Sequence, residues 1–276
     1  MDLRVLTWNL FHGRDHPPEA DLLTWRSRLL RTTERGAAHA QVNRDLLGPF
    51  SETIAGAEWD VALLQECPPR WAEALAAASG ADAHLVPTSR NLPYLARLQS
   101  LAATWNPDLI ASWEGGSNLT LVRTSGAGFS TITERRSLRL ATRPERRMMA
   151  ITRVGDGLCV ANLHASAARE AAERELIAAA RAAREWARGT PLVLGGDFNL
   201  RPALSGHVFS RLDEEFGLRS PTGDRVIDHL LASGLEVAGA PGQWPPEQRE
   251  VPDPTASGTP LPIRLSDHAP VEARFS

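Results

Sequence analysis

The sequence predicts an α/β or α+β fold in which two β-sheets pack face to face, with helices on their outer sides. Short apolar segments of strand length are bounded by helical segments in both halves of the chain. Hydrophobic residues make up 42% of the 276 residues, which is enough to bury a sizeable core. The chain has no internal repeat and no low-complexity linker, so residues 1–276 are expected to form a single domain.

A long helix is expected between the first two strands. These strands are apolar runs at residues 3–9 and 61–65, and the second ends at Glu66. Between them, apolar residues recur at helical spacing through residues 19–47, on a stripe formed by Leu22, Trp25, Leu29 and Leu30. We therefore expect a helix over this range, which Pro49 interrupts or ends because proline lacks the backbone N–H.

The middle of the chain is predicted to begin with a helix and then to be rich in strands. Residues 70–79 are expected to be helical up to Gly80, since glycine readily adopts the left-handed conformation that ends many helices. From about residue 83 to residue 163, apolar runs are separated by Gly, Pro and Ser. The strands expected there lie at Val86 and at residues 117–123, 129–133, 147–154 and 158–163.

The C-terminal part contains the clearest predicted helix. Residues 167–188 are rich in Ala, Glu and Arg, and Gly189 follows them. Further strands are expected at residues 192–195, 226–232, 234–238 and 270–275. The stretch 239–262 holds seven prolines and is predicted to be a long loop rather than a helix or a strand.

The composition excludes several kinds of chemistry. All 30 basic residues are arginine, so no lysine is available as a nucleophile, a Schiff base or a Walker A phosphate ligand. The two cysteines, Cys67 and Cys159, lie in apolar runs and are expected to be buried free thiols. The net charge of −3 argues against a globally basic nucleic-acid binder.

The sequence also predicts a cytoplasmic protein. No apolar stretch reaches the roughly 20 residues that a membrane-spanning helix needs. The first predicted strand follows directly on the N-terminus, without the charged and apolar regions of a secretory leader. No obligate protein partner is evident.

Polar residues that can bind metal ions or phosphate recur where the predicted strands end. They are Asn9, Glu66, His164, Asp197, Asn199, Asp228, His229, Asp267 and His268. Functional sites concentrate in loops at strand ends, and acids within apolar runs are costly unless they are paired or bound to metal. Carboxylate and amide oxygens with few histidines suit hard cations such as Mg²⁺ or Mn²⁺. Such a site could polarise a phosphoryl oxygen and activate a water molecule.

Six motifs, in this order, resemble those of the endonuclease/exonuclease/phosphatase family. They are Thr7-Trp8-Asn9, Leu64-Gln65-Glu66, Asn162-Leu163-His164, Gly195-Gly196-Asp197-Phe198-Asn199, Ile227-Asp228-His229 and Leu265-Ser266-Asp267-His268-Ala269-Pro270-Val271. This family includes deoxyribonuclease-I-like and apurinic-site endonucleases, phosphoinositide phosphatases and neutral sphingomyelinases. The resemblance covers residues 7–271. It implies a four-layer α/β-sandwich of two packed mixed β-sheets flanked by helices, with the site at one mouth of the sheets.

For the metal, the resemblance implies three ligands. Glu66 would be the main ligand of Mg²⁺, which Mn²⁺ could replace, with Asn9 beside it and Asp267 helping to hold the ion. Some family members carry a carboxylate two residues after the first Asn, where this chain has Phe11. The stretch between Asn9 and Glu66 is longer than in compact members, and it could cap the site or merely decorate the fold.

For catalysis, the resemblance implies five residues. Asp197 would orient or activate the attacking water, and Asn199 would contact the phosphate. His268, oriented by Asp228, would stabilise the five-coordinate phosphorus. His164 matches the position where nuclease members carry a second histidine or a tyrosine, and it is predicted to contact the substrate.

Three further residues have both a functional and a structural interpretation. Asn118 is a candidate substrate ligand, but its place after Ser117 in a Gly-rich segment could also reflect turn chemistry. His12 is equally open. His229 stands where many family members have an aromatic residue, and it could simply be packed.

The sequence leaves three hypotheses open for the function and the substrate. Residues 123–153 contain eight arginines and two glutamates, a local excess of +6 that could bind a polyanion or could be the charged solvent face of a hairpin. The first hypothesis, which we favour, is a metal-dependent phosphodiesterase or nuclease that acts on nucleic acid such as DNA. The second keeps the chemistry but acts on a phospholipid, a phosphoinositide or a small phosphodiester. The third is a binding module without catalysis.

Overall fold

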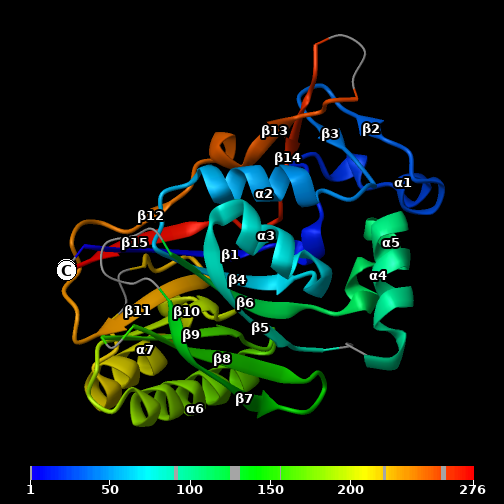
Figure 1. Ribbon diagram of the computed structural model, residues 1–276. Helices are drawn as coiled ribbons and strands as arrows, with labels where there is room; N and C mark the ends of the chain where they lie inside the picture. Colours follow the sequence, from blue (N-terminus) through cyan, green and yellow to red (C-terminus); the bar gives the residue numbers. More distant parts are fainter. Residues whose placement is uncertain (1, 90–92, 125–130, 156, 220–221, 256–258) are drawn as a thin grey trace.

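Two mixed β-sheets pack face to face in the computed structural model, which describes residues 2–89, 93–124, 131–155, 157–219, 222–255 and 259–276 (Figure 1). The first sheet has the order β12 (Gly242–Gln243), β15 (Val271–Phe275), β1 (Leu3–Asn9), β4 (Val61–Cys67), β6 (Ser117–Arg123) and β5 (Ala81–Pro87). The second has the order β11 (Asp228–Ser233), β10 (Leu192–Asp197), β9 (Leu158–His164), β8 (Arg147–Val154) and β7 (Ile132–Ala141). β1 pairs in parallel with β4, and β9 with β10, while their other neighbours run antiparallel.

Helices cover the outer side of each sheet and produce four layers. α2 (Leu47–Gly56) and α3 (Ala72–Ser79) pack on the first sheet, and α6 (Arg169–Ala187) and α7 (Pro202–Phe216) pack on the second (Figure 1). A third core, which includes Val5, Leu63, Val160 and Val193, lies between the two sheets. Because both faces of the central strands are buried, these strands are apolar along most of their length. The predicted four-layer sandwich is therefore confirmed.

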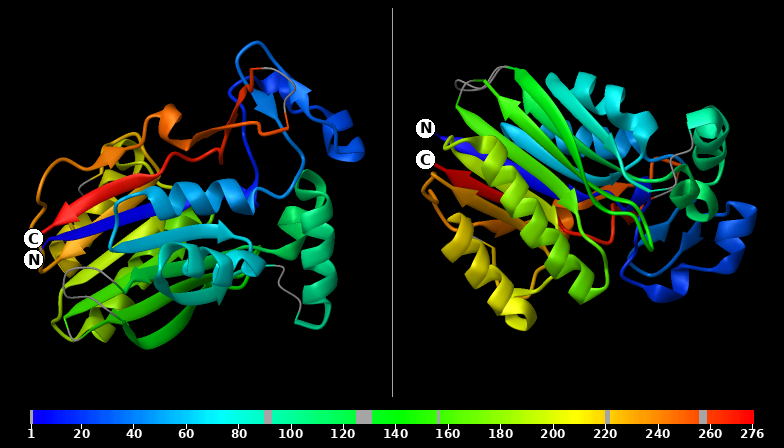
Figure 2. Two further views of the ribbon diagram at one scale, coloured as in Figure 1. Left: turned by 45° about the horizontal axis from the view of Figure 1, so that its top comes forward. Right: turned by 90° about the horizontal axis from the view of Figure 1, so that it is seen from below.

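The two ends of the chain lie side by side in the first sheet. β1 and β15 are antiparallel neighbours, and Leu3 pairs with Phe275 (Figure 2). At the opposite side of the molecule lie three shorter helices, α1 (Trp25–Leu30), α4 (Ala96–Trp105) and α5 (Pro107–Glu114).

The segment between β1 and β4 departs most from the prediction. The helix expected over residues 19–47 is wrong, because this range contains α1 and two short paired strands, β2 (Glu34–Arg35) and β3 (Ala40–Gln41). Leu22 of the predicted apolar stripe is buried, but Trp25, Leu29 and Leu30 are exposed. Pro49 does not end a helix. It lies in the first turn of α2, where its missing N–H has no helical partner to lose.

Three other helices, and the short strands and turn of the Pro-rich stretch, were not predicted. α4 and α5 interrupt the range 83–163, where only strands were expected, and α7 has no predicted counterpart. The Pro-rich stretch 239–262 is not a continuous loop. It contains β12, a 3-10 turn at Pro246–Arg249, and β13 (Glu250–Pro252), which pairs with β14 (Pro262–Arg264). Residues 234–238 do not form the expected strand, and only Val237 makes an isolated bridge, to Phe275.

Most of the remaining predictions are confirmed. β6 and β8 have the predicted bounds, and α6 begins and ends within two residues of the predicted helix. The strand expected at 129–133 begins outside the described residues, and β7 continues it to Ala141. Cys67 and Cys159 are buried free thiols. Within the described residues, no helix is long and apolar enough to cross a membrane.

Candidate active site

The strand faces that meet between the two sheets change from apolar to polar toward one end. Side chains alternate along a strand, so every second residue points to the same core. On β1 the buried Val5 is followed on this face by Thr7 and Asn9, and on β10 Val193 is followed by Asp197. The polar residues of both sheets therefore meet at the ends of these strands.

A pair of buried amides joins the sheets directly below this polar region. Gln65 Nε2 on β4 donates to Asn162 Oδ1 on β9 at 2.8 Å, and Asn162 Nδ2 donates to the Leu119 carbonyl at 3.1 Å. Both side chains are fully buried. A satisfied polar network of this kind fixes one alignment of the sheets, because any shift would leave buried groups without partners.

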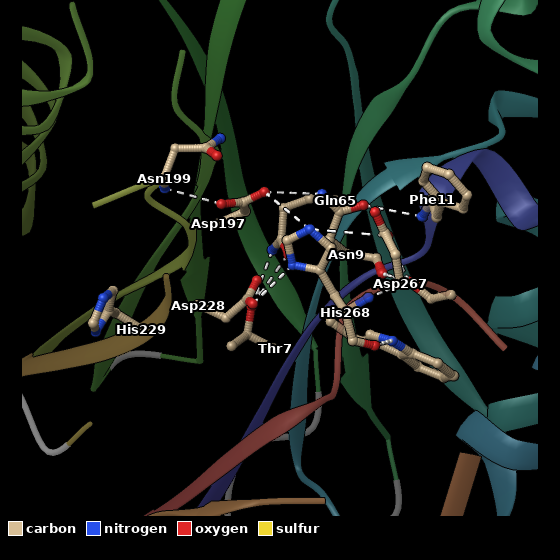
Figure 3. Close-up of polar contacts among 12 residues, drawn as sticks. Thr7, Asn9, Phe11, Gln65, Asp197, Asn199, Asp228, His229, Asp267 and His268 are labelled. Carbon is tan, nitrogen blue, oxygen red and sulfur yellow. Dashed lines mark hydrogen bonds and ion pairs between the residues drawn. The ribbon is translucent and has the colours of Figure 1, made fainter. Parts of the chain in front are cut away.

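The same alternation separates the two members of the Asp228-His229 motif. Asp228 points toward the other sheet, whereas His229 points to the outer side, where its ring lies 5.3 Å from that of Phe198 and 4.9 Å from that of Phe209 (Figure 3). His229 Nε2 also contacts the Leu200 carbonyl at 2.9 Å. His229 is therefore a packed residue, which is the structural interpretation given above.

His268 is held by a carboxylate from the opposite sheet. Its Nδ1 lies 2.8 Å from Asp228 Oδ2, and its backbone N–H donates to Ser266 Oγ at 3.0 Å (Figure 3). Burial disfavours the charged imidazole, but the hydrogen bond and charge of Asp228 outweigh it and raise the pKa of His268 to about 10. His268 is therefore a cation that can donate from Nε2.

Asp197 lies at the centre of the group. Its Oδ2 accepts from Asn9 Nδ2 at 2.9 Å, and its Oδ1 accepts from the backbone N–H of Asn199 at 2.9 Å. The ring nitrogens of His164 and His268 lie 3.4 and 3.8 Å from Asp197 Oδ2. Burial, with a further contribution from the charge of Asp228, raises the pKa of Asp197 to about 7. A carboxylate tuned in this way can accept a proton near neutral pH.

Glu66 reaches the site because its strand is irregular. The pairing of β4 with β6 shifts register between Leu64 and Cys67, and Glu66 has a φ of +47°. Such a bulge redirects a side chain relative to regular alternation. Glu66 Oε2 lies 3.2 Å from His12 Nε2, and its Oε1 lies 3.8 Å from His164 Nδ1. Burial opposes the charge of Glu66, but the neighbouring histidines outweigh it and keep its pKa below the ordinary value.

Backbone strain is concentrated around this site. Phe11, His12, Glu66, Asn199 and Ser266 have positive φ angles between 47° and 60°, a conformation that side chains disfavour. Among the described non-glycine residues, only Arg31 and Arg188 share it. Strained backbone often marks positions that are held in place for function.

The donor atoms of the site suit a divalent metal ion, and the assignment of Glu66, Asn9 and Asp267 as its ligands stays a prediction. Asp197, Asp228 and His268 have ligand atoms within 4.8 Å of one another. However, a protonated His268 bonded to Asp228 is a poor metal ligand. Glu66, Asn9 and Asp267 offer oxygen atoms only, which Mg²⁺ prefers. The position of Phe11 offers no ligand, because a phenyl ring has no metal-binding atom, and its ring instead lies 3.8 Å from the Arg14 guanidinium.

A polar pocket of about 200 Å³ opens beside Glu66 and His164. His12 lines it, as does Arg147, whose Nη1 lies 3.4 Å from His164 Nδ1. Sequence reasoning did not single out Arg147, which it counted only as one arginine of a basic segment. Its position directly after the β7–β8 turn carries no signal of its own, since the pairing of β8 with β9 brings it to His164.

Two predicted substrate ligands are held by the backbone. Asn118 is fully buried, and its Nδ2 donates to the Met148 carbonyl at 2.7 Å, which joins β6 to β8. Asn199 is half-buried at the rim, and its Nδ2 donates to the Ala165 carbonyl at 3.0 Å. Their contacts with a substrate stay predictions.

The geometry resembles that of known proteins. The sequence profile of the Endonuclease/Exonuclease/phosphatase family matches residues 6–268. A family protein from Bacteroides thetaiotaomicron has a similar structure, with a TM-score of 0.65 and 16% identity over 100% of this chain and 95% of that one. The mannosyl-6-phosphatase of Bacteroides thetaiotaomicron VPI-5482 gives 0.64 and 15%, over 99% of both chains. TDP2 from Caenorhabditis elegans gives 0.60 and 15%, over 100% of this chain and 74% of that one. No match was found among curated protein sequences. At these identities the structural similarity shows a shared fold.

Proposed function

The chain belongs to the Endonuclease/Exonuclease/phosphatase family, and from this premise we propose that it hydrolyses phosphodiesters with the help of a divalent metal ion, Mg²⁺ or Mn²⁺. Family membership makes the chain a hydrolase of phosphoester bonds. The metal and the diester substrate are the further steps of the proposal. The proposed hydrolysis is supported mainly by one observation: an acid, a protonated histidine and a histidine-orienting carboxylate converge from both sheets. The metal is supported by the oxygen donors of Glu66, Asn9 and Asp267.

In the proposed mechanism, Asp197 accepts the proton of the attacking water. Asn9 and the backbone N–H of Asn199 hold its two oxygens in a fixed orientation. His268 Nε2 donates to a phosphoryl oxygen as negative charge develops in the transition state, and Asp228 keeps its ring oriented and charged. His164 would contact the same phosphate from the opposite side of Asp197 Oδ2.

Glu66, Asn9 and Asp267 would hold the metal ion. When bound, the ion polarises a phosphoryl oxygen and stabilises the leaving oxyanion. Glu66 and Asp267 supply negative charge, and both act on the nearby Arg14 guanidinium. Removal of either carboxylate should therefore weaken cation binding, and it would also leave the charge of the buried Arg14 less compensated.

A nucleic-acid substrate is the second candidate, and exposed arginines on β7 favour it. Several arginines of residues 123–153 stabilise the protein itself. Arg123 lies over Trp59 at 4.2 Å, Arg135 pairs with Asp82, and Arg153 pairs with Glu134. The exposed arginines for which the described residues show no such partner are Arg136, Arg139 and Arg143. These could bind a polyanion, so DNA and RNA belong in the substrate test.

The proposal is tested by hydrolysis of plasmid DNA, abasic-site duplex, RNA, sphingomyelin, phosphoinositides and bis(p-nitrophenyl) phosphate. Each is assayed with Mg²⁺, with Mn²⁺ and after chelation. The variant Asp197→Ala/His268→Ala should be inactive. His207→Ala is the matched control, because His207 is exposed on α7 and pairs with Glu173 at 3.4 Å, outside the site. Hydrolysis that continues after chelation would refute the proposed dependence on a metal ion. Hydrolysis by the double variant would refute the assignment of the active site.

A further inference from the structure

Three helices near the active site expose their apolar side chains to solvent. Trp25 on α1 is 72% exposed, Leu101 on α4 is 69% exposed, and Trp113 on α5 is 45% exposed. Single exposed apolar residues are normal, but large groups of them mark interaction sites. We name this group the α1–α4–α5 face, and its apolar members are Trp25, Leu29, Leu30, Leu98, Leu101, Trp105, Leu109 and Trp113.

Several uncharged polar residues of these helices point inward, while leucines and tryptophans of the same helices face solvent. Gln99 is buried, and its Nε2 donates to the Trp113 carbonyl at 2.8 Å. Asn106 is also buried, and its Nδ2 donates to the Arg28 carbonyl at 2.7 Å. These bonds fix the rotation of α4 and α5 and join them to α1. The exposed leucines and tryptophans are therefore held on the outer side by specific inward contacts.

The α1–α4–α5 face is positively charged. Its exposed arginines are Arg26, Arg28, Arg31 and Arg97. The two acids of these helices point inward, where Asp108 accepts from Gln41 Nε2 at 2.6 Å and the buried Glu114 pairs with Arg70. Arg31 lies over the Trp105 ring at 5.1 Å and so connects α1 with α4. Apolar and cationic side chains are thus exposed together on these three helices, which are described along their whole length and have no exposed acid.

This face adjoins the active site. Ser112 of α5 lines the same polar pocket as Glu66 and His164, and the next residue, Trp113, belongs to the α1–α4–α5 face. Figures 1 and 2 show the three helices side by side, at the side of the molecule opposite the chain ends. A surface bound at this face would lie next to the mouth of the pocket.

We propose that the α1–α4–α5 face binds an anionic phospholipid surface and presents the pocket to phosphoesters within it. This extends the proposed hydrolysis and rests on it, since it names where the substrate lies. Tryptophan and leucine side chains insert at the boundary between headgroups and acyl chains, and arginines bind anionic headgroups. The phosphates of a nucleic acid would bind the arginines, but a nucleic acid would offer the exposed leucines no apolar partner. The mixed chemistry therefore favours a lipid surface.

The experiment measures sedimentation with vesicles of phosphatidylcholine alone and of phosphatidylcholine mixed with phosphatidylglycerol. We expect binding to the mixed vesicles that decreases with added salt. Leu101→Ser/Trp105→Ser should weaken it by about tenfold or more. The charge reversal Arg26→Glu/Arg97→Glu should do the same without changing an apolar residue. Leu204→Ser is the matched control, because Leu204 on α7 is 65% exposed outside this face and should leave binding unchanged.

The catalytically impaired Asp197→Ala/His268→Ala variant should bind vesicles as well as the unmodified chain. This separates the two proposals. If the unmodified chain binds vesicles but hydrolyses no phosphoester, only the proposed function is contradicted. Failure to bind mixed vesicles, or equal binding by the face variants and Leu204→Ser, would overturn the lipid inference. So would self-association through Leu101 and Trp105 in the absence of vesicle binding, since the face would then serve a protein partner.

Discussion

The charge of Asp228 raises the pKa of His268 and so determines which protonation state His268 brings to the reaction. Asp228 is buried and lies on the second sheet, whereas His268 lies between β14 and β15, just before β15 of the first sheet. Its carboxylate has one oxygen on His268 Nδ1, and its other oxygen has no hydrogen-bond partner among the described atoms. We therefore propose that Asp228 orients and charges the imidazole rather than contacting the substrate.

Asp228→Asn keeps the size of this side chain but removes its charge. We expect kcat on bis(p-nitrophenyl) phosphate to fall by about 10²- to 10⁴-fold, with KM nearly unchanged, because transition-state stabilisation depends on a cationic His268. Steady-state kinetics would measure both constants. A variant that raises KM and keeps kcat would show that Asp228 instead helps to bind the substrate.

Glu66→Gln tests the metal ligand at the same scale. The amide is nearly isosteric but neutral, so we expect Mn²⁺ binding, measured by titration calorimetry, to weaken by about tenfold or more. Glu58→Gln is the control, because the Glu58 side chain is 75% exposed and bonds to Arg4, away from the site. Equal Mn²⁺ affinity in the Glu66 and Glu58 variants would exclude Glu66 as a ligand.

Single residues of the site differed in how far the sequence could predict them. Asp197 and His268 follow apolar runs in recognisable motifs, so their grouping was expected. Arg147 and His12 carry no such motif, and only the tertiary structure brings them to the pocket. The outward direction of His229 follows from strand alternation, which the sequence showed but which needs the strand register to be applied.

At the scale of elements, β9 and β10 approach so closely before the site that one position requires glycine. Gly196 has a φ of +135°, and a Cβ atom there would lie 1.9 Å from the Leu163 carbonyl oxygen. Leu163 and Gly196 are paired in register immediately before His164 and Asp197. The glycine therefore sets the distance between two predicted catalytic residues.

Gly196→Ala should lower the free energy of unfolding by about 3 kcal/mol or more, since the added methyl forces the two strands apart. Gly206→Ala is the matched control. Gly206 lies in α7, and a methyl group added there would meet no described atom within 4 Å, so its substitution should be neutral or stabilise by about 1 kcal/mol. Urea unfolding measures both, and similar stabilities for the two variants would contradict the close packing of β9 on β10.

The sequence predicted an element correctly where the apolar side of its periodic pattern is also its buried side. α6 has an inward apolar stripe and was found, as were the buried strands β6 and β8. The stripe at residues 19–47 was misleading because spacing shows which residues share a side, but not whether that side is buried. α4 and α5 were missed for a related reason, since their large apolar side chains face solvent and their buried residues are small or polar.

At the scale of the whole molecule, stability depends on contacts between the sheets. His84 on β5 lies 2.8 Å from Thr152 Oγ1 on β8, so this buried hydrogen bond connects the two sheets. Burial, with a smaller contribution from Arg135, lowers the pKa of His84 to about 4. The fold therefore favours neutral His84 more strongly than the unfolded chain does.

This predicts that His84 contributes a loss of stability in acid, whereas Asp197, with a pKa raised to about 7, contributes in the opposite direction. Between about pH 6.5 and pH 4 the unfolded chain binds a proton at His84 that the folded chain does not, so the contribution of His84 to stability falls as the pH decreases through this window. His164, with a pKa lowered to about 3, acts in the same direction. His84→Gln should flatten the dependence of the unfolding free energy on pH. An unchanged slope in that variant would exclude His84 as its source.

The overall architecture was the most predictable level. Alternating apolar strands and outer helices indicated two packed sheets, and the order of motifs identified which strand ends meet. The surface could not be predicted in the same way. Whether an apolar side chain is buried depends on segments far away in the sequence, so the α1–α4–α5 face became visible only in the folded chain.

Leu3 and Phe275 are paired neighbours, so the two ends of the chain could be joined and the chain opened at another loop. The first sheet uses residues from both ends, whereas the second is built from residues 132–233 alone. A circular permutant with joined ends, opened between β6 and β7, would build each sheet from one uninterrupted segment. Because termini that lie close together tolerate such rearrangement, we expect it to fold and to keep its hydrolytic activity. An inactive or unfolded permutant would show that the order of synthesis, and not only the final set of contacts, matters for this fold.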